Sequence, residues 1–185
     1  MTSLEAITGH RIVEDDRIRW LTHQSTLREK IFEQRLIADI GLELIERGTE
    51  FTVLNAMWDR DGYDVVVDAG PIVRHIQLKA TTVGTATREV PINVRLAAKP
   101  SGCVIWLVFD PIGRRFTEYR WFGAAPGLPL PDLGDRPVRH TRANAAGVKA
   151  IRPDIRALGL ARFERLATVG ELADRLFGKE AHGCA

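Results

Sequence analysis

The segment at residues 103–110, CVIWLVFD, is apolar up to its last residue and limits the fold more than any other part of the chain. A strand with one solvated face alternates between apolar and polar residues, whereas this run is apolar on both faces. It predicts a central strand in a sheet that is covered on both sides. Residues 116–122 follow Gly113 and are expected to form its hairpin partner.

A long helix is expected at residues 22–47, which contain no proline and a single glycine, Gly41. Gly48 stands just beyond this segment, where a helix C-cap favours glycine. Apolar residues at helical spacing occur on two sides of the expected helix, which predicts that most of it is buried. One side holds Leu36, Ile37, Ile40 and Leu44, and the other holds Leu27, Ile31, Ala38, Leu42 and Ile45.

Three strands are expected after the helix, at residues 51–56, 63–68 and 72–80. The turn at 69–71 would join the second and third strands in a hairpin. Residues 90–98 fit a short strand or a short helix, and residues 123–137 hold four prolines and three glycines, which is typical of a loop. This order predicts an α/β fold, with a mixed central sheet flanked by helices.

The C-terminal part, residues 138–180, is expected to be a basic and helical extension of a core at about 22–122, within a single domain of residues 1–185. Thr168 and Glu171 have the spacing of a capping box and predict a last helix that ends near Phe177. Trp106 and Cys103 are expected in the core, and the two cysteines predict neither a disulfide framework nor a zinc site.

Composition favours a cytoplasmic protein. No apolar run reaches the 18 or so residues of a membrane span, and the N-terminus lacks the pattern of a signal peptide. Charge is unevenly distributed, since residues 1–70 hold 14 acidic and eight basic side chains and the remaining residues hold ten and 18. This asymmetry fits a protein that holds a cation and meets a polyanion, although an ordinary solvated surface explains it equally well.

The densest basic stretch supplies candidate contacts to nucleic-acid phosphates. The residues singled out for that role are Arg139, Arg142, Lys149 and Arg152.

The hairpin at residues 63–80 carries the candidate chemistry. Alternation places Asp64 on one face of the second strand, and Gln77 and Lys79 together on one face of the third. A four-residue turn at 69–72 would set Asp64 directly opposite Gln77, and a two-residue turn would set it on the diagonal. Either register brings a carboxylate, an amide oxygen and an ammonium together.

Glu33 is the expected fourth member of this group. It lies within the first apolar side of the long helix, where a carboxylate needs a partner such as a cation or Lys79. Glu29, one turn earlier, is the reserve candidate.

These pieces together resemble the PD-(D/E)xK nuclease superfamily, which includes restriction endonucleases and Holliday-junction resolvases. The matching elements are a helical glutamate, the strand GYDVVV at 62–67 and the motif IQLKA at 76–80, within residues 25–110. Bacterial members with a Gln-x-Lys motif are the nearest in appearance. The family's commonest form has Asp or Glu where this chain has Gln77, and that departure removes one negative charge from the expected metal site.

The resemblance implies a restriction-endonuclease-like core and hydrolysis of phosphodiesters, most readily in DNA. Mg²⁺ or Mn²⁺ would be held by Asp64, Gln77, Glu33 and the Leu78 backbone carbonyl, which are hard oxygen donors. Lys79 would orient or deprotonate the attacking water, or hold the scissile phosphate. By analogy with relatives that cut both strands, a homodimer is an open alternative.

Two other classes of protein remain open from the sequence. One is a catalytically inactive nuclease-fold module that binds nucleic acid or a protein. The other is an unrelated α/β domain, such as an immunity protein, in which Glu33 would lie far from Gln77 and Lys79.

Overall fold

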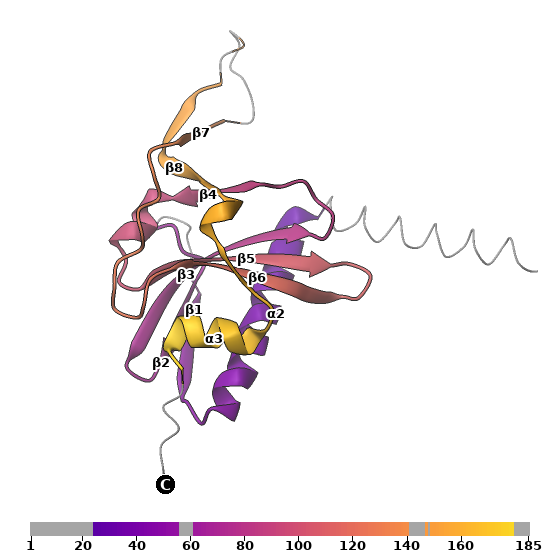
Figure 1. The fold of residues 1–185 in the computed structure, drawn as a ribbon, viewed down its shortest axis with the longest axis vertical. Helices are drawn as coiled ribbons and strands as arrows, with labels where there is room; N and C mark the ends of the chain where they lie inside the picture. Colours follow the sequence, from indigo (N-terminus) through magenta and orange to yellow (C-terminus); the bar gives the residue numbers. More distant parts are fainter. Residues whose placement is uncertain (1–23, 56–60, 141–146, 148, 180–185) are drawn as a thin grey trace, which may run out of the picture.

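The computed structural model describes residues 24–55, 61–140, 147 and 149–179, and these form three layers. A six-stranded mixed sheet lies in the middle, with helices α2 and α3 on one face and a three-stranded sheet over the other (Figure 1). The expected α/β class with a mixed sheet is therefore confirmed.

The larger sheet has the strand order β1-β2-β3-β5-β6-β9. The pairing of β3 with β5 is parallel, and every other pairing in this sheet is antiparallel. The apolar run at 103–110 forms the interior strand β5, as expected. The strands are β1 (Phe51–Asn55), β2 (Val65–Ala69), β3 (Ile72–Thr82), β5 (Gly102–Asp110), β6 (Arg115–Gly123) and β9 (Glu164–Leu166).

The smaller sheet has the order β4-β8-β7, with β4 at Glu89–Asn93, β8 at Ile151–Gly159 and β7 at Pro137–Arg139. A short 3-10 helix, η1, follows β4 at Val94–Ala98, so residues 90–98 contain both a strand and a helix. The expected helical extension is wrong over this part, because residues 137–139 and 151–159 are strands. Pro153 lies where the β7–β8 register shifts, and a bulge accepts a proline since it needs no ladder N–H.

Helix α2 (Ser25–Glu46) ends at the predicted glycine. Gly48 has φ +63°, and the N–H groups of Gly48 and Thr49 donate to the carbonyls of Ile45 and Leu44. This pair of bonds is a Schellman motif, which satisfies carbonyls that the helix itself leaves open. Within the part of the chain that the structure describes, no helix is long and apolar enough to cross a bilayer.

Two hydrophobic cores lie on the two faces of the larger sheet. Alternate residues of β5 divide between them, since Cys103, Ile105 and Leu107 face the helices while Val104 and Trp106 face the smaller sheet. Trp106 and Cys103 are fully buried, as expected. Burial raises the pKa of the Cys103 thiol to about 12, with the charge of Arg74 acting in the opposite direction. Such a thiol is protonated at neutral pH and unreactive.

The second apolar side of α2 contradicts the expectation of a helix buried all round. Leu36, Ile40 and Leu44 are buried in the helix-side core, but the opposite side is open to solvent. Leu27 is 48% exposed, Ile31 47%, Leu42 62% and Ile45 64%. Helical periodicity identified both apolar sides correctly, but among the described residues only one side has a layer to pack against.

A fully buried arginine, Arg74, joins β3 to the last helix, α3 (Val169–Phe177). Its guanidinium donates to the backbone carbonyls of Leu176 at 2.5 Å, Arg175 at 2.9 Å and Ala124 at 3.1 Å. It also lies 5.4 Å from the ring centroid of Trp121. The side chain therefore satisfies carbonyls at the C-terminal end of α3 that the helix cannot pair itself.

The capping box of α3 is present as predicted. The Thr168 hydroxyl accepts from the Glu171 N–H, and the Glu171 carboxylate accepts from the Thr168 N–H. Thr168→Ala is expected to lower the free energy of unfolding by about 1 kcal/mol, because one N–H of the first turn loses its partner. Urea denaturation measures this change, with Thr168→Ser as the matched control that keeps the hydroxyl. Equal midpoints for the alanine and serine variants would contradict the role of the cap.

Candidate functional site

The site forms where β3 continues beyond its neighbour β2. The β2–β3 register pairs Ala69 with Ile72 and Val65 with Ile76, which is the four-residue turn among the two predicted alternatives. β2 begins at Val65, and residues 61–64 before it form no strand, so among the described residues the edge of β3 from Leu78 onward has no partner strand on that side. The continued register sets Asp64 opposite Gln77, as one of the sequence alternatives predicted.

Asp64 closes the last bonds of the hairpin. Its N–H donates to the Ile76 carbonyl at 2.8 Å, and its Oδ2 accepts from the Leu78 N–H at 2.6 Å. Backbone groups of alternate residues point to the same edge of a strand, so the Leu78 carbonyl faces this edge with its N–H. The carboxylate of Asp64 and the Leu78 carbonyl thus lie at the same open edge, as hard oxygen donors.

Glu33 approaches the same edge from α2. The residue is only 5% exposed although it is ionisable, and Lys30 supplies the charge partner, with Nζ at 3.0 and 2.9 Å from the two carboxylate oxygens. The prediction of a buried helical glutamate is correct, and its described partner is Lys30, one turn earlier on the same helix. A lysine on the more exposed side of the pair can move with its flexible stem without disturbing the helix.

Lys79 reaches the edge from the other face of β3. It pairs with Trp106 of β5, on the face opposite the one that α2 covers, while Leu78 packs with the helix-side core. Because β2 has ended, side chains from both faces of β3 border the same opening. This arrangement explains how a helix on one face and a lysine on the other line one pocket.

The pocket has a volume of about 480 Å³. It takes its walls from α2, the residue before β2, β3, the start of β4 with the segment that leads into it, and β5. Four carboxylates and two ammonium groups border it, so it holds both signs of charge, with acids in excess. The lining residues are Thr26, Glu29, Lys30, Phe32, Glu33, Asp64, Leu78, Lys79, Ala80, Thr87, Glu89, Val90, Pro91 and Leu107.

Gln77 does not line this pocket. Its side chain is 4% exposed, and its Oε1 accepts from the Asn93 N–H at 3.3 Å, under the start of η1. Gly62, with φ +79°, packs against Asn93 so closely that a Cβ would lie 2.7 Å from the Asn93 Cβ. The turn before Asp64 and the end of β4 therefore enclose Gln77. An amide oxygen has two lone pairs and could accept a second bond, but the Gln77 oxygen is turned toward the backbone of β4.

The reserve candidate Glu29 and two polar residues near the hairpin differ in whether they line the pocket. Glu29 lines the pocket, so the reserve acid is close to the site. His75 lies outside it, with its Nδ1 at 2.8 Å from the Pro100 carbonyl. Asp61 accepts from Lys99 at 2.7 Å and does not line the pocket.

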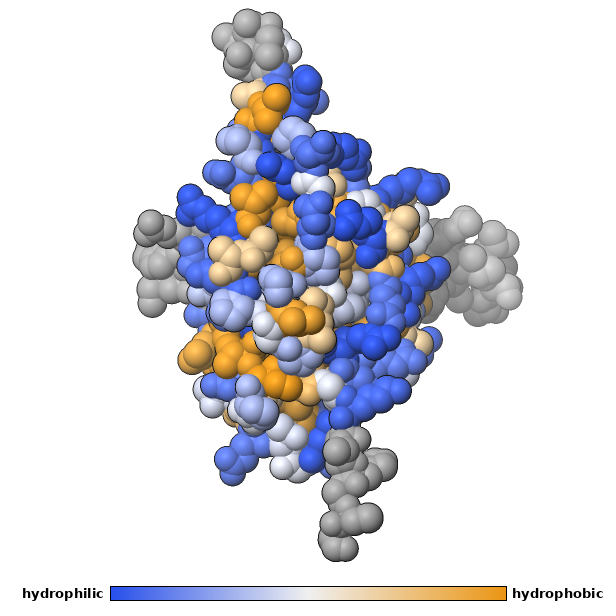
Figure 2. Space-filling model, turned by 60° about the vertical axis from the view of Figure 1, so that its left-hand side comes forward, coloured by the Kyte–Doolittle hydropathy of each residue, from blue (hydrophilic) through white to orange (hydrophobic). Residues whose placement is uncertain are grey.

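Three of the four basic candidates lie on the arm formed by β7 and β8, which projects from the top of the molecule in Figure 1. Arg139, Lys149 and Arg152 are all exposed, and Val138 pairs with Arg152 across the two strands. Arg142 lies outside the described residues. Figure 2 shows hydrophilic residues over much of the arm and of the face below it.

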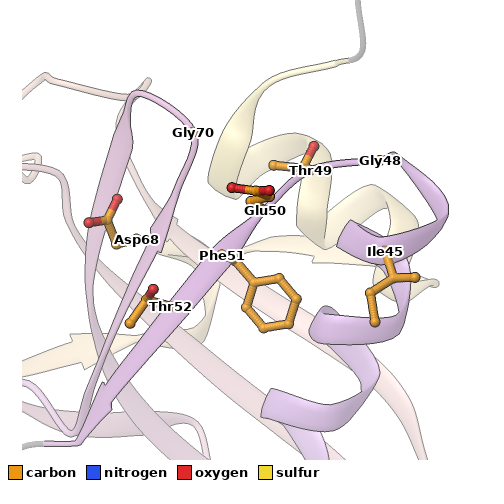
Figure 3. A pocket seen from close by; sticks show the side chains of 8 residues that line it. All are labelled: Ile45, Gly48, Thr49, Glu50, Phe51, Thr52, Asp68 and Gly70. Carbon is orange, nitrogen blue, oxygen red and sulfur yellow. The ribbon is translucent and has the colours of Figure 1, made fainter.

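A second pocket, of about 670 Å³, lies at the other end of α2 (Figure 3). Ile45, Phe51 and Thr52 line it together with Glu50 and Asp68, whose carboxylates are the charged groups on its wall. Neither a cation nor a histidine lines this pocket, so the charge pattern that acid–base and phosphate chemistry requires is found at the first pocket.

Comparison of the chain with known protein families, with curated proteins and with solved structures found no match. Among the described residues, no three side chains of His, Cys, Asp or Glu are close enough together to hold a metal ion. Of the four carboxylates at the pocket, Asp64 is bonded to the strand edge, and the other candidate oxygen donors there are Glu33 and the Leu78 carbonyl. This donor set fits Mg²⁺, which keeps several waters and needs few protein ligands.

Proposed function

We propose that this chain is a metal-dependent nuclease of the restriction-endonuclease-like class, which hydrolyses phosphodiester bonds of nucleic acid, most readily DNA, in the cytoplasm. The observation that carries the proposal is the pocket at the open edge of β3, where Glu33, Asp64, the Leu78 backbone and Lys79 converge from three segments. The family resemblance names these four positions and also Gln77, whose side chain lies outside the pocket. A pocket that combines hard oxygen donors with an amine supplies what phosphodiester hydrolysis needs.

The chain's own residues have separate roles in this proposal. Asp64 and the Leu78 carbonyl would hold Mg²⁺ at the strand edge, with Glu33 on the opposite wall. A bound Mg²⁺ supplies a water of lowered pKa and neutralises phosphate charge. Lys79 would orient the attacking water or hold a phosphate oxygen, and Lys30 would balance the charge of Glu33 before substrate enters.

The decisive experiment incubates the full chain with plasmid DNA, single-stranded DNA and RNA, each with Mg²⁺, with Mn²⁺ or with a chelator. Cleavage that needs the metal is expected, with DNA as the preferred substrate. Cleavage that continues in chelator would exclude the metal site, and preference for RNA would change the substrate class. No cleavage of any substrate under any condition would refute a catalytic role.

A catalytically inactive nuclease-fold module is the second candidate, and one observation favours it. The Gln77 side chain, which stands where the family has an acid, is buried against Asn93 and does not line the pocket. An inactive module would bind DNA without cutting it, and that binding would not depend on a divalent ion. Measuring binding with and without Mg²⁺ therefore separates the two candidates.

Lys79→Ala is expected to lower kcat about 10²-fold while KM changes little, because the ammonium acts on the attacking water or on charge that develops in the transition state. Steady-state cleavage of plasmid DNA measures both constants. Lys179→Ala, at an exposed lysine beyond α3, is the matched control and should leave both unchanged. A raised KM at unchanged kcat would make Lys79 a simple substrate anchor.

Removing two charges from the β7–β8 arm is expected to flatten the salt dependence of DNA binding. In Arg139→Gln/Arg152→Gln, the slope of log K against log salt should fall by about 2, since each lost phosphate contact releases about one counterion fewer. Fluorescence anisotropy over a salt series measures the slope. The control, Arg114→Gln/Lys179→Gln, removes two exposed charges elsewhere, and an unchanged slope in the arm variant would exclude Arg139 and Arg152.

A further inference from the structure

In the part of the chain that the structure describes, the exposed side of α2 carries an apolar stripe that neither sheet covers. We define the stripe by its four large side chains, Leu27, Ile31, Leu42 and Ile45, each close to half exposed or more. Gln34 and Ala38 lie between the two ends and are also exposed. Four aliphatic residues on one face of a 22-residue helix, about 33 Å long, exceed the scattered apolar residues of an ordinary surface.

The stripe is symmetric about its own centre. Leu27 lies nine residues before position 36 and Ile45 lies nine residues after it, and Ile31 and Leu42 are placed almost as evenly. A helix with this pattern matches a copy of itself that runs in the opposite direction. Leu27 would meet the partner's Ile45, Ile31 would meet the partner's Leu42, and the small Ala38 would allow the axes to approach at the crossing.

A row of four charged residues runs along one side of the stripe. Their positions have the same symmetry, but the charge on one half of the row is opposite to the charge on the other half. At helical spacing, Arg28 and Arg35 share a side with Asp39 and Glu46. The basic pair lies toward the N-terminus and the acidic pair toward the C-terminus. In an antiparallel pair, a two-fold axis brings these rows together, so Arg28 would face the partner's Glu46 and Arg35 would face the partner's Asp39.

This order of charges is the reverse of what a single helix prefers. The first turn of α2 has no acidic residue and the last turn has no basic residue, whereas the helix dipole favours acids at the start and bases at the end. Arg35 bonds to Asp39 at 3.1 Å at the centre, and Arg28 lies 4.0 Å from Glu29, but Arg28 and Glu46 are 18 residues apart on the same helix and do not reach each other. An antiparallel second copy brings opposite charges to both ends of the helix at once.

We propose that α2 is the interface of a homodimer in which the helices of two chains pack antiparallel across a two-fold axis. The pocket of Figure 3 adjoins Ile45, at the end of the stripe where the partner's Leu27 would arrive. Glu33 lies buried on the sheet side of α2, so the contact leaves the candidate catalytic pocket open. The inference rests on the helix surface and is independent of the proposed hydrolysis.

Sedimentation equilibrium of the full chain over a wide range of concentration tests the interface. A dimer is expected, and Ile31→Gln/Leu42→Gln should shift the chain to monomer. Ile112→Gln, at an equally exposed aliphatic residue in the β5–β6 turn, should leave the dimer intact. A monomer at every concentration would overturn the proposal and leave the chain's own residues 1–23 as the occupant to test. A dimer that survives the double substitution would also overturn it.

Two charge variants test the antiparallel direction. Arg28→Glu/Arg35→Glu makes the row wholly acidic, and Asp39→Lys/Glu46→Lys makes it wholly basic. Each variant alone should dissociate because like charges meet, while an equal mixture should restore a dimer that contains one chain of each. Circular dichroism confirms that both variants fold. If the mixture stays monomeric although both are folded, the antiparallel contact is excluded.

Discussion

Asp64→Asn is expected to lower the cleavage rate about 10²–10³-fold while the protein keeps its stability. Asparagine has the same shape, and its side-chain oxygen still accepts from the Leu78 N–H, which now lies 2.6 Å from the Asp64 carboxylate. What the variant loses is the negative charge that would hold Mg²⁺ at the edge of β3. Single-turnover cleavage and isothermal titration with Mn²⁺ measure the two effects, and both activity and metal binding should fall together.

Asp68→Asn is the matched control for this prediction. Asp68 lies four residues along the same segment, is exposed, and borders the pocket at the other end of α2. Its substitution removes the same charge from the same hairpin without touching the candidate site, so activity should not change. A fully active Asp64→Asn variant, or equal losses in both variants, would end the metal proposal.

Arg74→Met is expected to lower the free energy of unfolding by about 3–5 kcal/mol. The substitution keeps the apolar stem but leaves the carbonyls of Leu176, Arg175 and Ala124 without their donor, and a buried acceptor that loses its partner costs about 1–3 kcal/mol. Few single substitutions reach this size. Urea denaturation followed by circular dichroism measures it.

The control for Arg74 is Arg88→Met, at an exposed arginine before β4, which should change stability by no more than about 0.5 kcal/mol. If Arg74→Met is as mild as this control, the three hydrogen bonds contribute little. Hydrogen exchange adds a local readout, because the loss should appear first in the last turn of α3 if the guanidinium holds that turn in place.

The sequence correctly predicted the elements that depend on residues close together in the chain. The apolar run at 103–110 became β5, Gly48 ended α2, and Thr168 and Glu171 formed the box that starts α3. The turn at Ala69–Ile72 fixed the register that set Asp64 opposite Gln77. In each case the deciding interaction joins residues only a few positions apart, so a short stretch of sequence is enough to predict it.

Predictions failed where the partner is distant in sequence. The arginine-rich segment was expected to be helical, but β8 pairs with β4, some 60 residues earlier. Gln77 was expected to share a pocket with Asp64, but the Asn93 backbone binds its oxygen. The burial of Arg74 had a signal that went unused, since alternation puts it on the same face of β3 as Ile76, which is core.

The bonds of Arg74 also affect the order in which the chain can fold. Two of these bonds join Arg74 to Arg175 and Leu176, which lie 101 and 102 positions later in the chain. The guanidinium therefore finds two of its three acceptors only when α3 is complete. During synthesis the central sheet would be translated long before those acceptors exist. The native helix-side core should therefore close late, only after α3 has been synthesised, and a chain truncated before residue 169 would leave Arg74 with one of its three acceptors, the Ala124 carbonyl.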